Sequence, residues 1–316
     1  MAKIIAELCQ NHNGSIETLK EMICAAAEAG ATYAKMQSLF ADDLTYRERF
    51  EQGQKDGMSV KTIKRPYRVE YERLRKLDLD RDAHVTFLDE CKAAGIRPLT
   101  TIFARSRIPM ISDLGFKDVK VASYDCASYT LIRELMETFE HLYISTGATF
   151  DDEVEKTAGM LSGHSFSFLH CVTIYPTPLG KLNLNRMKFL RKFTKEVGFS
   201  DHTFADNDGL KADIVALFTG ADVIERHFTL LPRGKTKDGP VSIDYEQLKE
   251  LVEFSKMNRD ELREHVLKIP NYDEMIKSEN LGLSDEELLN RDYYRGRFAS
   301  KINGKVIFNW ESDSVF

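Results

Sequence analysis

Short apolar runs, each about the length of a β-strand, alternate along this chain with longer segments whose apolar residues recur at helical spacing. The first run is Lys3–Cys9, and the helical segment after it is Ile16–Gly30, which ends at a glycine. The next run, Thr32–Gln37, completes a strand–helix–strand unit. Two strands joined in this way lie parallel and are usually neighbours in one sheet.

The same unit repeats along most of the chain. The predicted strands are Lys3–Cys9, Thr32–Gln37, Arg97–Phe103, Asp118–Ser123, His141–Thr146, Ser165–Thr173, Val197–Thr203 and Asp222–Phe228. The predicted helices are Ile16–Gly30, Arg81–Ala94, one beginning near Tyr129, Leu182–Thr194, Gly209–Gly220 and Tyr245–Val266. This series predicts an α/β fold, a (β/α)8 TIM barrel with a short C-terminal extension. An open, doubly wound sheet is the alternative, but no GxGxxG motif follows the first strand and no asymmetry marks a switch point.

Two segments lie outside this repeat. Ala41–Arg73 is polar and too long for an ordinary connection between strand and helix, so we expect a lid or a substrate loop. Residues 267–316 follow the last predicted helix. We therefore expect a barrel domain over residues 1–266, which carries the chemistry, and a C-terminal tail over residues 267–316.

Composition narrows the class of protein. A chain of 316 residues, 42% of them hydrophobic, can bury a full core. The net charge of −6 argues against nucleic-acid binding, no apolar run is long enough to cross a membrane, and the first residues do not form a signal peptide. The five cysteines are odd in number and form no CxxC pair, so we expect reduced core residues of a cytoplasmic protein.

Two histidines stand at the ends of consecutive predicted strands. His202 closes Val197–Thr203 and His227 closes Asp222–Phe228, and the carboxyl ends of parallel strands are where barrels gather their chemistry. Neutral imidazole is a good ligand for a divalent ion such as Zn²⁺, Mn²⁺ or Fe²⁺. The alternative is a pair of inert, hydrogen-bonded histidines.

Two lysines lie inside otherwise apolar strands. Lys35 and Lys120 cannot point into a core without a partner, so each must face an internal carboxylate or an anionic ligand. Small hydroxyl donors beside them suit phosphate oxygens. The alternative is a lysine–carboxylate pair inside the barrel, with Glu7 or Glu225. The other polar or aromatic residues at the strand ends are Gln10, Asn11, His12, Gln37, Thr101, Phe103, Ser123, Asp125, Ser145, Thr146, His170, Thr173, Tyr175, Ser200 and Asp201.

These residues belong to motifs that resemble one family. The motifs are AELCQNHNGS (Ala6–Ser15), AKMQS (Ala34–Ser38), KVASYD (Lys120–Asp125), ISTGA (Ile144–Ala148), HCVTIYPTP (His170–Pro178), FSDHT (Phe199–Thr203) and ERHFTL (Glu225–Leu230). In this order and spacing they are similar to the sialic acid synthases, from about Ile4 to Leu251. That family condenses phosphoenolpyruvate with an N-acylated hexosamine to give a nonulosonic acid.

The resemblance implies a role for each matching residue. His202 and His227 would hold a divalent metal, Mn²⁺ or Mg²⁺, and Glu7 would be the acid or base near the reacting carbons. The implied phosphoenolpyruvate site consists of Lys35, Thr101, Lys120, Ser123, Ser145 and Ser200. The implied acceptor-sugar site consists of Gln37, Phe103, Asp125, Thr173, Tyr175 and Asp238. The resemblance also implies a homodimer.

The chain departs from the family pattern in three places. Thr173 stands where asparagine or serine is common, and Ile102 replaces the proline of a TPF turn, which leaves that loop less restricted. Family members carry a C-terminal antifreeze-like domain that supplies an arginine to the partner's active site. Here RGRFASKINGKVI (Arg295–Ile307) resembles the linker to that domain and its first strand, and we expect the rest to be absent. We expect Arg291–Trp310 to pack on its own or a neighbour's barrel, as an ordered strand or hairpin from which Arg295 or Arg297 can replace that arginine. The alternative is a tail that only caps the barrel, with both arginines solvated.

Three functions therefore remain. The first is the metal-dependent synthase with an N-acetylmannosamine-like acceptor, and the second is the same chemistry on a different or phosphorylated sugar. The third is a barrel that binds phosphoenolpyruvate or a sugar without turnover. A metal-dependent hydrolase is disfavoured, because the first strand lacks an HxH pair.

Overall fold

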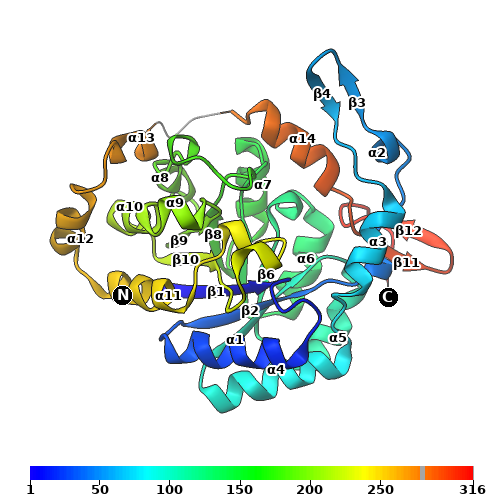
Figure 1. The fold of residues 1–316 in the computed structure, drawn as a ribbon. Coiled ribbons are helices and arrows are strands. Elements are labelled where there is room, and N and C mark those ends of the chain that lie inside the picture. The colour runs from blue at the N-terminus through cyan, green and yellow to red at the C-terminus, as the bar shows by residue number, and fades with distance from the viewer. Residues whose placement is uncertain (278–281, 316) are drawn as a thin grey trace.

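The strands close into one parallel barrel. The computed structural model describes residues 1–277 and 282–315. The barrel strands are β1 (Lys3–Cys9), β2 (Tyr33–Ser38), β5 (Arg97–Ile102), β6 (Asp118–Val121), β7 (His141–Ser145), β8 (Ser165–His170), β9 (Glu196–Asp201) and β10 (Val223–His227). Each pairs with its neighbours in the order β1-β10-β9-β8-β7-β6-β5-β2 (Figure 1). The predicted (β/α)8 barrel is confirmed.

Helices surround this barrel (Figure 1). They are α1 (Ile16–Glu28), α4 (Arg81–Ala94), α5 (Ile108–Asp113), α6 (Tyr129–Thr138), α7 (Asp151–Met160), α8 (Arg186–Leu190), α9 (Ala205–Asp208), α10 (Lys211–Thr219), α11 (Tyr245–Lys256) and α12 (Arg259–Val266). In the part of the chain that the structure describes, no helix is both long and apolar enough to span a bilayer.

The side chains of β1 face alternately the surrounding helices and the inside of the barrel. Ile4 and Leu8 belong to the large core between the barrel and the helices. Ile5 belongs instead to the smaller cluster inside the barrel. Because side chains alternate along a strand, Glu7 shares the inward face with Ile5. The register of β1 with β2 shifts between Glu7 and Cys9, and Cys9, with a φ of 50°, also faces the inside of the barrel at its carboxyl end.

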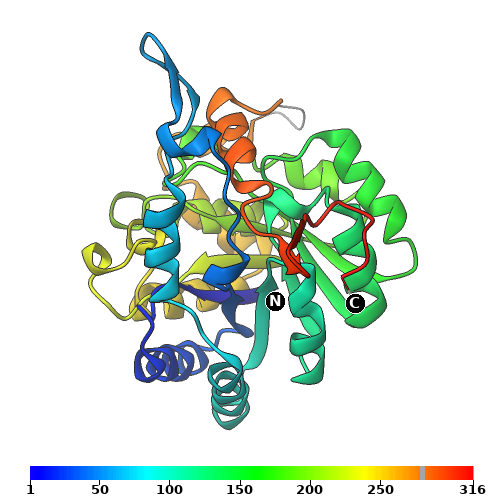
Figure 2. The same cartoon turned by 90° about the vertical axis from the view of Figure 1, so that its right-hand side faces the viewer.

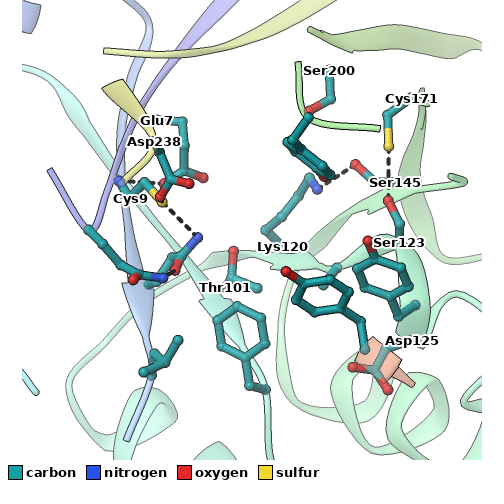
Figure 3. A pocket seen from close by; sticks show the side chains of 18 of the residues that line it. Glu7, Cys9, Thr101, Lys120, Ser123, Asp125, Ser145, Cys171, Ser200 and Asp238 are labelled. Carbon is teal, nitrogen blue, oxygen red and sulfur yellow. Dashed lines mark hydrogen bonds between the residues drawn. The ribbon is translucent and has the colours of Figure 1, made fainter. Parts of the chain in front are cut away.

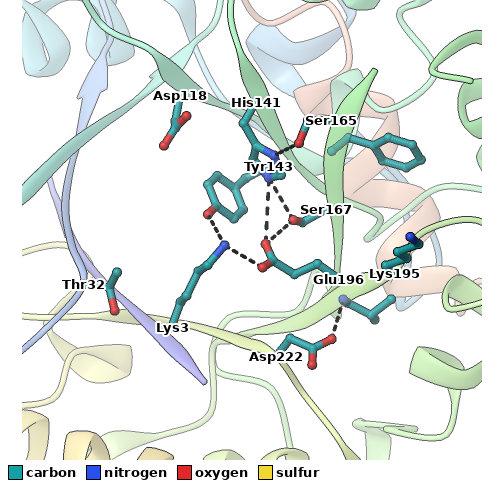
Figure 4. A network of polar contacts seen from close by, with 12 residues as sticks. Lys3, Thr32, Asp118, His141, Tyr143, Ser165, Ser167, Lys195, Glu196 and Asp222 are labelled. Carbon is teal, nitrogen blue, oxygen red and sulfur yellow. Dashed lines mark hydrogen bonds and ion pairs between the residues drawn. The ribbon is translucent and has the colours of Figure 1, made fainter. Parts of the chain in front are cut away.

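A polar network fills the opposite, amino-terminal end of the barrel (Figure 4). Lys3 Nζ donates to Glu196 Oε2 at 2.5 Å, and Ser167 Oγ donates to Glu196 Oε1 at 2.5 Å. Lys3 Nζ also lies 3.5 Å from the hydroxyl of Tyr143. These groups satisfy one another, so this end is a closed, structural face and the chemistry is left to the other end.

The long insertion after β2 forms a substructure of its own. It contains a short 3₁₀ turn (Ala41–Asp43), α2 (Arg49–Gln52), the hairpin β3 (Gln54–Asp56) and β4 (Ser59–Thr62), and α3 (Tyr67–Arg75). In both views the hairpin projects away from the barrel (Figures 1 and 2). The segments on either side of it border the barrel mouth.

The tail returns to the barrel mouth. It contains α13 (Tyr272–Ile276), α14 (Asp285–Tyr294) and a hairpin of β11 (Ser300–Ile302) and β12 (Lys305–Ile307). Figure 2 shows this hairpin between the insertion and the helices of the middle of the chain. Phe298 pairs with Leu44 of the insertion and is buried. The tail therefore packs on its own barrel, as an ordered hairpin.

Several predicted boundaries were wrong. The helix predicted over Tyr245–Val266 is two helices, because Asn258 caps a new one through the backbone N–H groups of Asp260 and Glu261. Several strands end earlier than predicted: β6 ends at Val121, β8 at His170 and β9 at Asp201, so His202 directly follows its strand. Cys24 is exposed and not in the core, although all five cysteines are free thiols.

Candidate active site

The strand ends converge on one cavity of about 310 Å³. Of the residues that the sequence placed in the site, those that line it are Glu7, Lys35, Gln37, Thr101, Phe103, Lys120, Ser123, Asp125, Ser145, Tyr175, Ser200, His202, His227 and Asp238. Thr173 does not line it: its side chain is buried, and its backbone carbonyl accepts a hydrogen bond from Asn290 Nδ2 at 2.7 Å. The structure thus brings together residues from β1, β2, β5 to β7, β9, β10 and their loops.

The two lysines lie deep in this cavity and have internal partners. Lys35 forms an ion pair with Glu7 and donates to Thr101 Oγ1 at 3.0 Å. Lys120 donates to Ser145 Oγ at 2.6 Å (Figure 3). The lysine–carboxylate pairing that we held as the alternative is therefore present. Both lysines nevertheless face the cavity, so their role toward an anion stays a prediction.

Glu225 stands between the two ammonium groups. Its Oε2 lies 3.9 Å from Lys35 Nζ and 3.7 Å from Lys120 Nζ, while Ser200 Oγ donates to its Oε1 at 2.9 Å. Burial lowers the pKa of Lys35 to about 7; Glu225 opposes this and Lys120 reinforces it. Burial raises the pKa of Glu225, but the two lysines outweigh it and hold that pKa below its usual value. Two lysines and two carboxylates, Glu7 and Glu225, thus lie together, with hydroxyl groups around the lysines.

The histidines and a thiol gather on the other side of the cavity. The ring centres of His202 and His227 are 5.1 Å apart, and the ring of Tyr175 lies 4.2 Å from that of His202. Cys9 Sγ donates to Asp238 Oδ2 at 2.8 Å, and ligand atoms of Cys9, His227 and Asp238 all lie within 4.8 Å of one another. Figure 3 shows Glu7, Cys9 and Asp238 across the cavity from Lys120 and Ser145.

The protonation and hydrogen bonding of the two imidazoles suit the binding of a divalent metal. Burial lowers the pKa of both His202 and His227, so the imidazoles are neutral. Among the described residues, neither Nδ1 atom has a hydrogen-bond partner, although both are buried. Unpaired buried nitrogens beside a thiol and a carboxylate match the ligand types of transition-metal sites. The residues present therefore fit a metal at Cys9, His227 and Asp238. His202, the other predicted ligand, is not among the atoms that lie within 4.8 Å of one another, but its ring centre is 5.1 Å from that of His227.

Asn309 of the C-terminal tail forms hydrogen bonds with another part of the cavity wall. Asp125 Oδ1 accepts hydrogen bonds from Ser128 Oγ at 2.7 Å and from Asn309 Nδ2 at 3.0 Å. Asn309 Nδ2 also donates to the carbonyl of Phe103 at 2.9 Å. Burial raises the pKa of Asp125. A tail residue thus holds two residues that the resemblance assigns to the acceptor sugar.

Three residues that line the cavity were not predicted from the sequence: Cys9, Arg65 and Lys237. Cys9 was interpreted as a core thiol; it lines the cavity because the strand is irregular there, with a register shift between Glu7 and Cys9 and a positive φ at Cys9. Arg65 and Lys237 line the cavity together with Arg297. No local signal identifies these two, because each lies in an irregular segment. Of the two tail arginines considered, Arg297 is the one that lines the cavity.

These features define the class: a (β/α)8 barrel whose polar cavity, at the carboxyl ends of its strands, holds paired lysines beside a cluster of metal-ligand side chains. Residues 22–266 match the NeuB family, so the chain belongs to that family. The chain is 30% identical over 262 residues to N,N'-diacetyllegionaminic acid synthase of Campylobacter jejuni, covering 78% of this chain and 73% of the relative.

Two further similarities extend over most of the chain. It is 28% identical over 314 residues to a pseudaminic acid synthase of Campylobacter jejuni, covering 98% of this chain and 85% of the relative. The fold matches the crystal structure of an N-acetylneuraminic acid synthetase from Leptospira borgpetersenii with a TM-score of 0.70 and 22% identity, covering 92% and 90% of the chains. These relatives are named for the synthesis of sialic-type acids.

Proposed function

We propose that this protein condenses phosphoenolpyruvate with an open-chain N-acyl hexosamine, giving a sialic-type nonulosonic acid and inorganic phosphate. The observation that carries the proposal is the convergence of Lys35 and Lys120 on a cavity that is also lined by the metal-ligand side chains of Cys9, His227 and Asp238. Membership of the NeuB family and similarity to sialic-type acid synthases support it.

The lysine side binds phosphoenolpyruvate. The phosphate and carboxylate of this substrate bear several negative charges, and two buried ammonium groups can neutralise them. Hydroxyls of Thr101 and Ser145 already contact those ammonium groups and can donate to the anion's remaining oxygens. Glu225 keeps both lysines in place before the substrate arrives, so little reorganisation is needed on binding.

The reaction joins two carbons and releases phosphate. The methylene carbon of phosphoenolpyruvate attacks the aldehyde carbon of the sugar, whose oxygen becomes a hydroxyl. Water adds to the carbon that bears the phosphate, and phosphate leaves by cleavage of the carbon–oxygen bond. The carboxylate of Glu7, beside Lys35 on the cavity wall, is placed to accept the proton of that water.

A metal belongs at the cluster of Cys9, His227 and Asp238. These three residues would hold it, with His202, whose buried Nδ1 is also unpaired among the described residues, as the further ligand that the resemblance implies, and when bound it supplies Lewis-acid polarisation of a carbonyl oxygen. The resemblance implies Mn²⁺ or Mg²⁺. Imidazole and sulfur ligands favour a transition ion over Mg²⁺, which prefers oxygen. Asp238, which the resemblance assigns to the sugar, lies at this cluster and can serve both groups.

One assay tests the proposal. Phosphate release from phosphoenolpyruvate is measured with a panel of N-acyl hexosamines and with Mn²⁺, Mg²⁺ or a chelator. We expect release that needs both an acceptor and a metal, and that is lost in His202→Ala while the fold is retained by circular dichroism. Turnover that persists in a chelator, or a His202→Ala protein with full activity, would overturn the metal assignment. If no N-acyl hexosamine supports release, the proposed acceptor class is wrong, and the same assay with other and phosphorylated sugars separates a different acceptor from a barrel that binds without turnover.

A homodimer and a cytoplasmic location are also proposed, from the family resemblance and the reduced cysteines. Light scattering on the purified protein decides the first. A monomeric mass at working concentration would contradict it.

A further inference from the structure

Three cations from three separate segments line the outer part of the cavity. Arg65 follows the β3–β4 hairpin, Lys237 lies in the loop after β10, and Arg297 lies in the tail after α14. We call these three residues the mouth cluster. They lie on loops outside the strand ends, whereas the deep lysines, Lys35 and Lys120, lie within β2 and β6.

Carboxylates near the mouth cluster do not balance its charge. Glu70 lies behind it and accepts two hydrogen bonds from the guanidinium of Arg73, at 3.0 and 2.9 Å, and one from Arg297. Lys237 Nζ is 4.0 Å from the same carboxylate. The other carboxylate in this region, Asp238, accepts from the Cys9 thiol. One buried carboxylate is thus shared among Arg73, Arg297 and Lys237, while Arg65 has no ion-pair partner among the described residues.

The cations are close enough to affect one another. Arg65 and Arg297 lie over the same aromatic ring, 5.8 and 5.9 Å from the centre of Tyr293. Lys237 and Arg297 share the Glu70 carboxylate, so their charges lie side by side. Arg297 is 7% exposed, and its Nε has no hydrogen-bond partner among the residues that the structure describes.

We propose that the mouth cluster binds an anionic substituent of the acceptor sugar, either a phosphate monoester or a carboxylate. Guanidinium and ammonium groups are the side chains that recognise both. The inference rests on the proposed function, because it places phosphoenolpyruvate at the deep lysines. An acceptor whose aldehyde lies near Cys9 and His227 then extends outward toward Arg65, Lys237 and Arg297. The substrate class is therefore a charged hexosamine and not a neutral one.

Direct binding tests this independently of turnover. Isothermal titration calorimetry compares three ligands without phosphoenolpyruvate: N-acetylmannosamine, the same sugar phosphorylated on its terminal hydroxyl, and the matching uronic acid. We expect the wild type to bind at least one charged sugar about tenfold or more tightly than the neutral one, the range of one charge-assisted contact. The phosphate and carboxylate arms show which anion is preferred.

The variants are Arg65→Gln and Lys237→Met, which leave the buried Arg297–Glu70 pair intact. Each should lower the affinity for the preferred charged sugar about tenfold and leave binding of the neutral sugar and of phosphoenolpyruvate unchanged. The matched controls are Arg68→Gln and Lys235→Met, because neither side chain lines the cavity. They should change nothing.

Three outcomes overturn the inference: equal affinity of the wild type for charged and neutral sugars, variants that bind charged sugars normally, or a loss confined to phosphoenolpyruvate. The last result would assign the mouth cluster to that substrate instead. If charged sugars bind and the variants lose them, but no acceptor yields phosphate release, the mouth cluster stands and the proposed function fails.

Discussion

Cys9 changes the set of metal ligands expected in the cavity. The resemblance implies two histidines there, and the structure adds a thiol and a carboxylate whose ligand atoms lie within 4.8 Å of those of His227. The thiol of Cys9 donates a hydrogen bond to Asp238, and burial together with that carboxylate raises the pKa of the thiol well above the usual value. Metal binding must therefore release a proton from sulfur, since the thiolate is the ligand form.

A cobalt titration tests this assignment. Co²⁺ added to the metal-free protein should produce the near-ultraviolet charge-transfer band of a cobalt–thiolate bond. Cys9→Ser should abolish that band and weaken Co²⁺ binding at least about tenfold. Loss of a residue that only contacts a metal ligand already lowers affinity by about this factor, and loss of a ligand should lower it at least as much. Cys171→Ser, which changes another cysteine of the cavity wall, should keep the band. A band that survives in Cys9→Ser, or Co²⁺ bound without one in the wild type, would show that sulfur is not a ligand.

At the scale of elements, the tail is part of the site's wall. Its helix α14 and hairpin β11–β12 bury Tyr293, Phe298 and Ile307 against the barrel and the insertion. Removing the whole tail would uncover these apolar groups and confuse loss of stability with loss of function. A single substitution at Asn309, which bonds Asp125 and Phe103, separates the two.

Asn309→Ala should raise the Michaelis constant for the acceptor by about three- to tenfold, the effect of losing a hydrogen bond that positions a carboxylate. The dissociation constant for phosphoenolpyruvate should stay unchanged, because Lys35 and Lys120 do not contact the tail in the described structure. Lys305→Ala, an exposed residue of the same hairpin, is the control. An unchanged Michaelis constant in a stable Asn309→Ala protein would mean that the tail only covers the barrel.

At the scale of the whole molecule, the two ends of the barrel have different tasks. The carboxyl end holds the cavity with its unpaired polar atoms, whereas the amino end is closed by the network around Glu196 (Figure 4). Polar groups that satisfy one another in a half-buried position contribute to stability, and they are too far from the cavity to affect a ligand.

Glu196→Ala should therefore lower the free energy of unfolding by about 1.5–3 kcal/mol, the range for hydrogen bonds to a charged group. Urea denaturation measures this, and calorimetry should show an unchanged affinity for phosphoenolpyruvate. The control is Glu140→Ala, which removes the ion pair between Glu140 and Lys117. These two side chains are 69% and 70% exposed, so the free energy of unfolding should fall by no more than about 0.5 kcal/mol. Weaker phosphoenolpyruvate binding in Glu196→Ala would contradict the separation of the two ends.

The barrel, and most of the cavity's lining, could be predicted from local patterns. Strand and helix periods are local properties, and the residue at the end of a parallel strand faces the same edge wherever the strand lies. His202, Lys35 and Lys120 were placed in this way. The break at Asn258 was missed because the apolar spacing continues across it, and only the cap ends the helix.

What the sequence by itself determined is the fold and the chemical character of each strand end. Tertiary structure decided which groups meet. Cys9 and Asp238 are 229 positions apart, and Glu70 and Arg297 are 227 apart. Nothing local in either segment indicates the other, since their contact arises only when the barrel closes and the insertion and tail fold over its mouth. Irregular segments have no period from which a direction can be read, so the positions of Arg65, Lys237 and Arg297 depend on long-range packing alone.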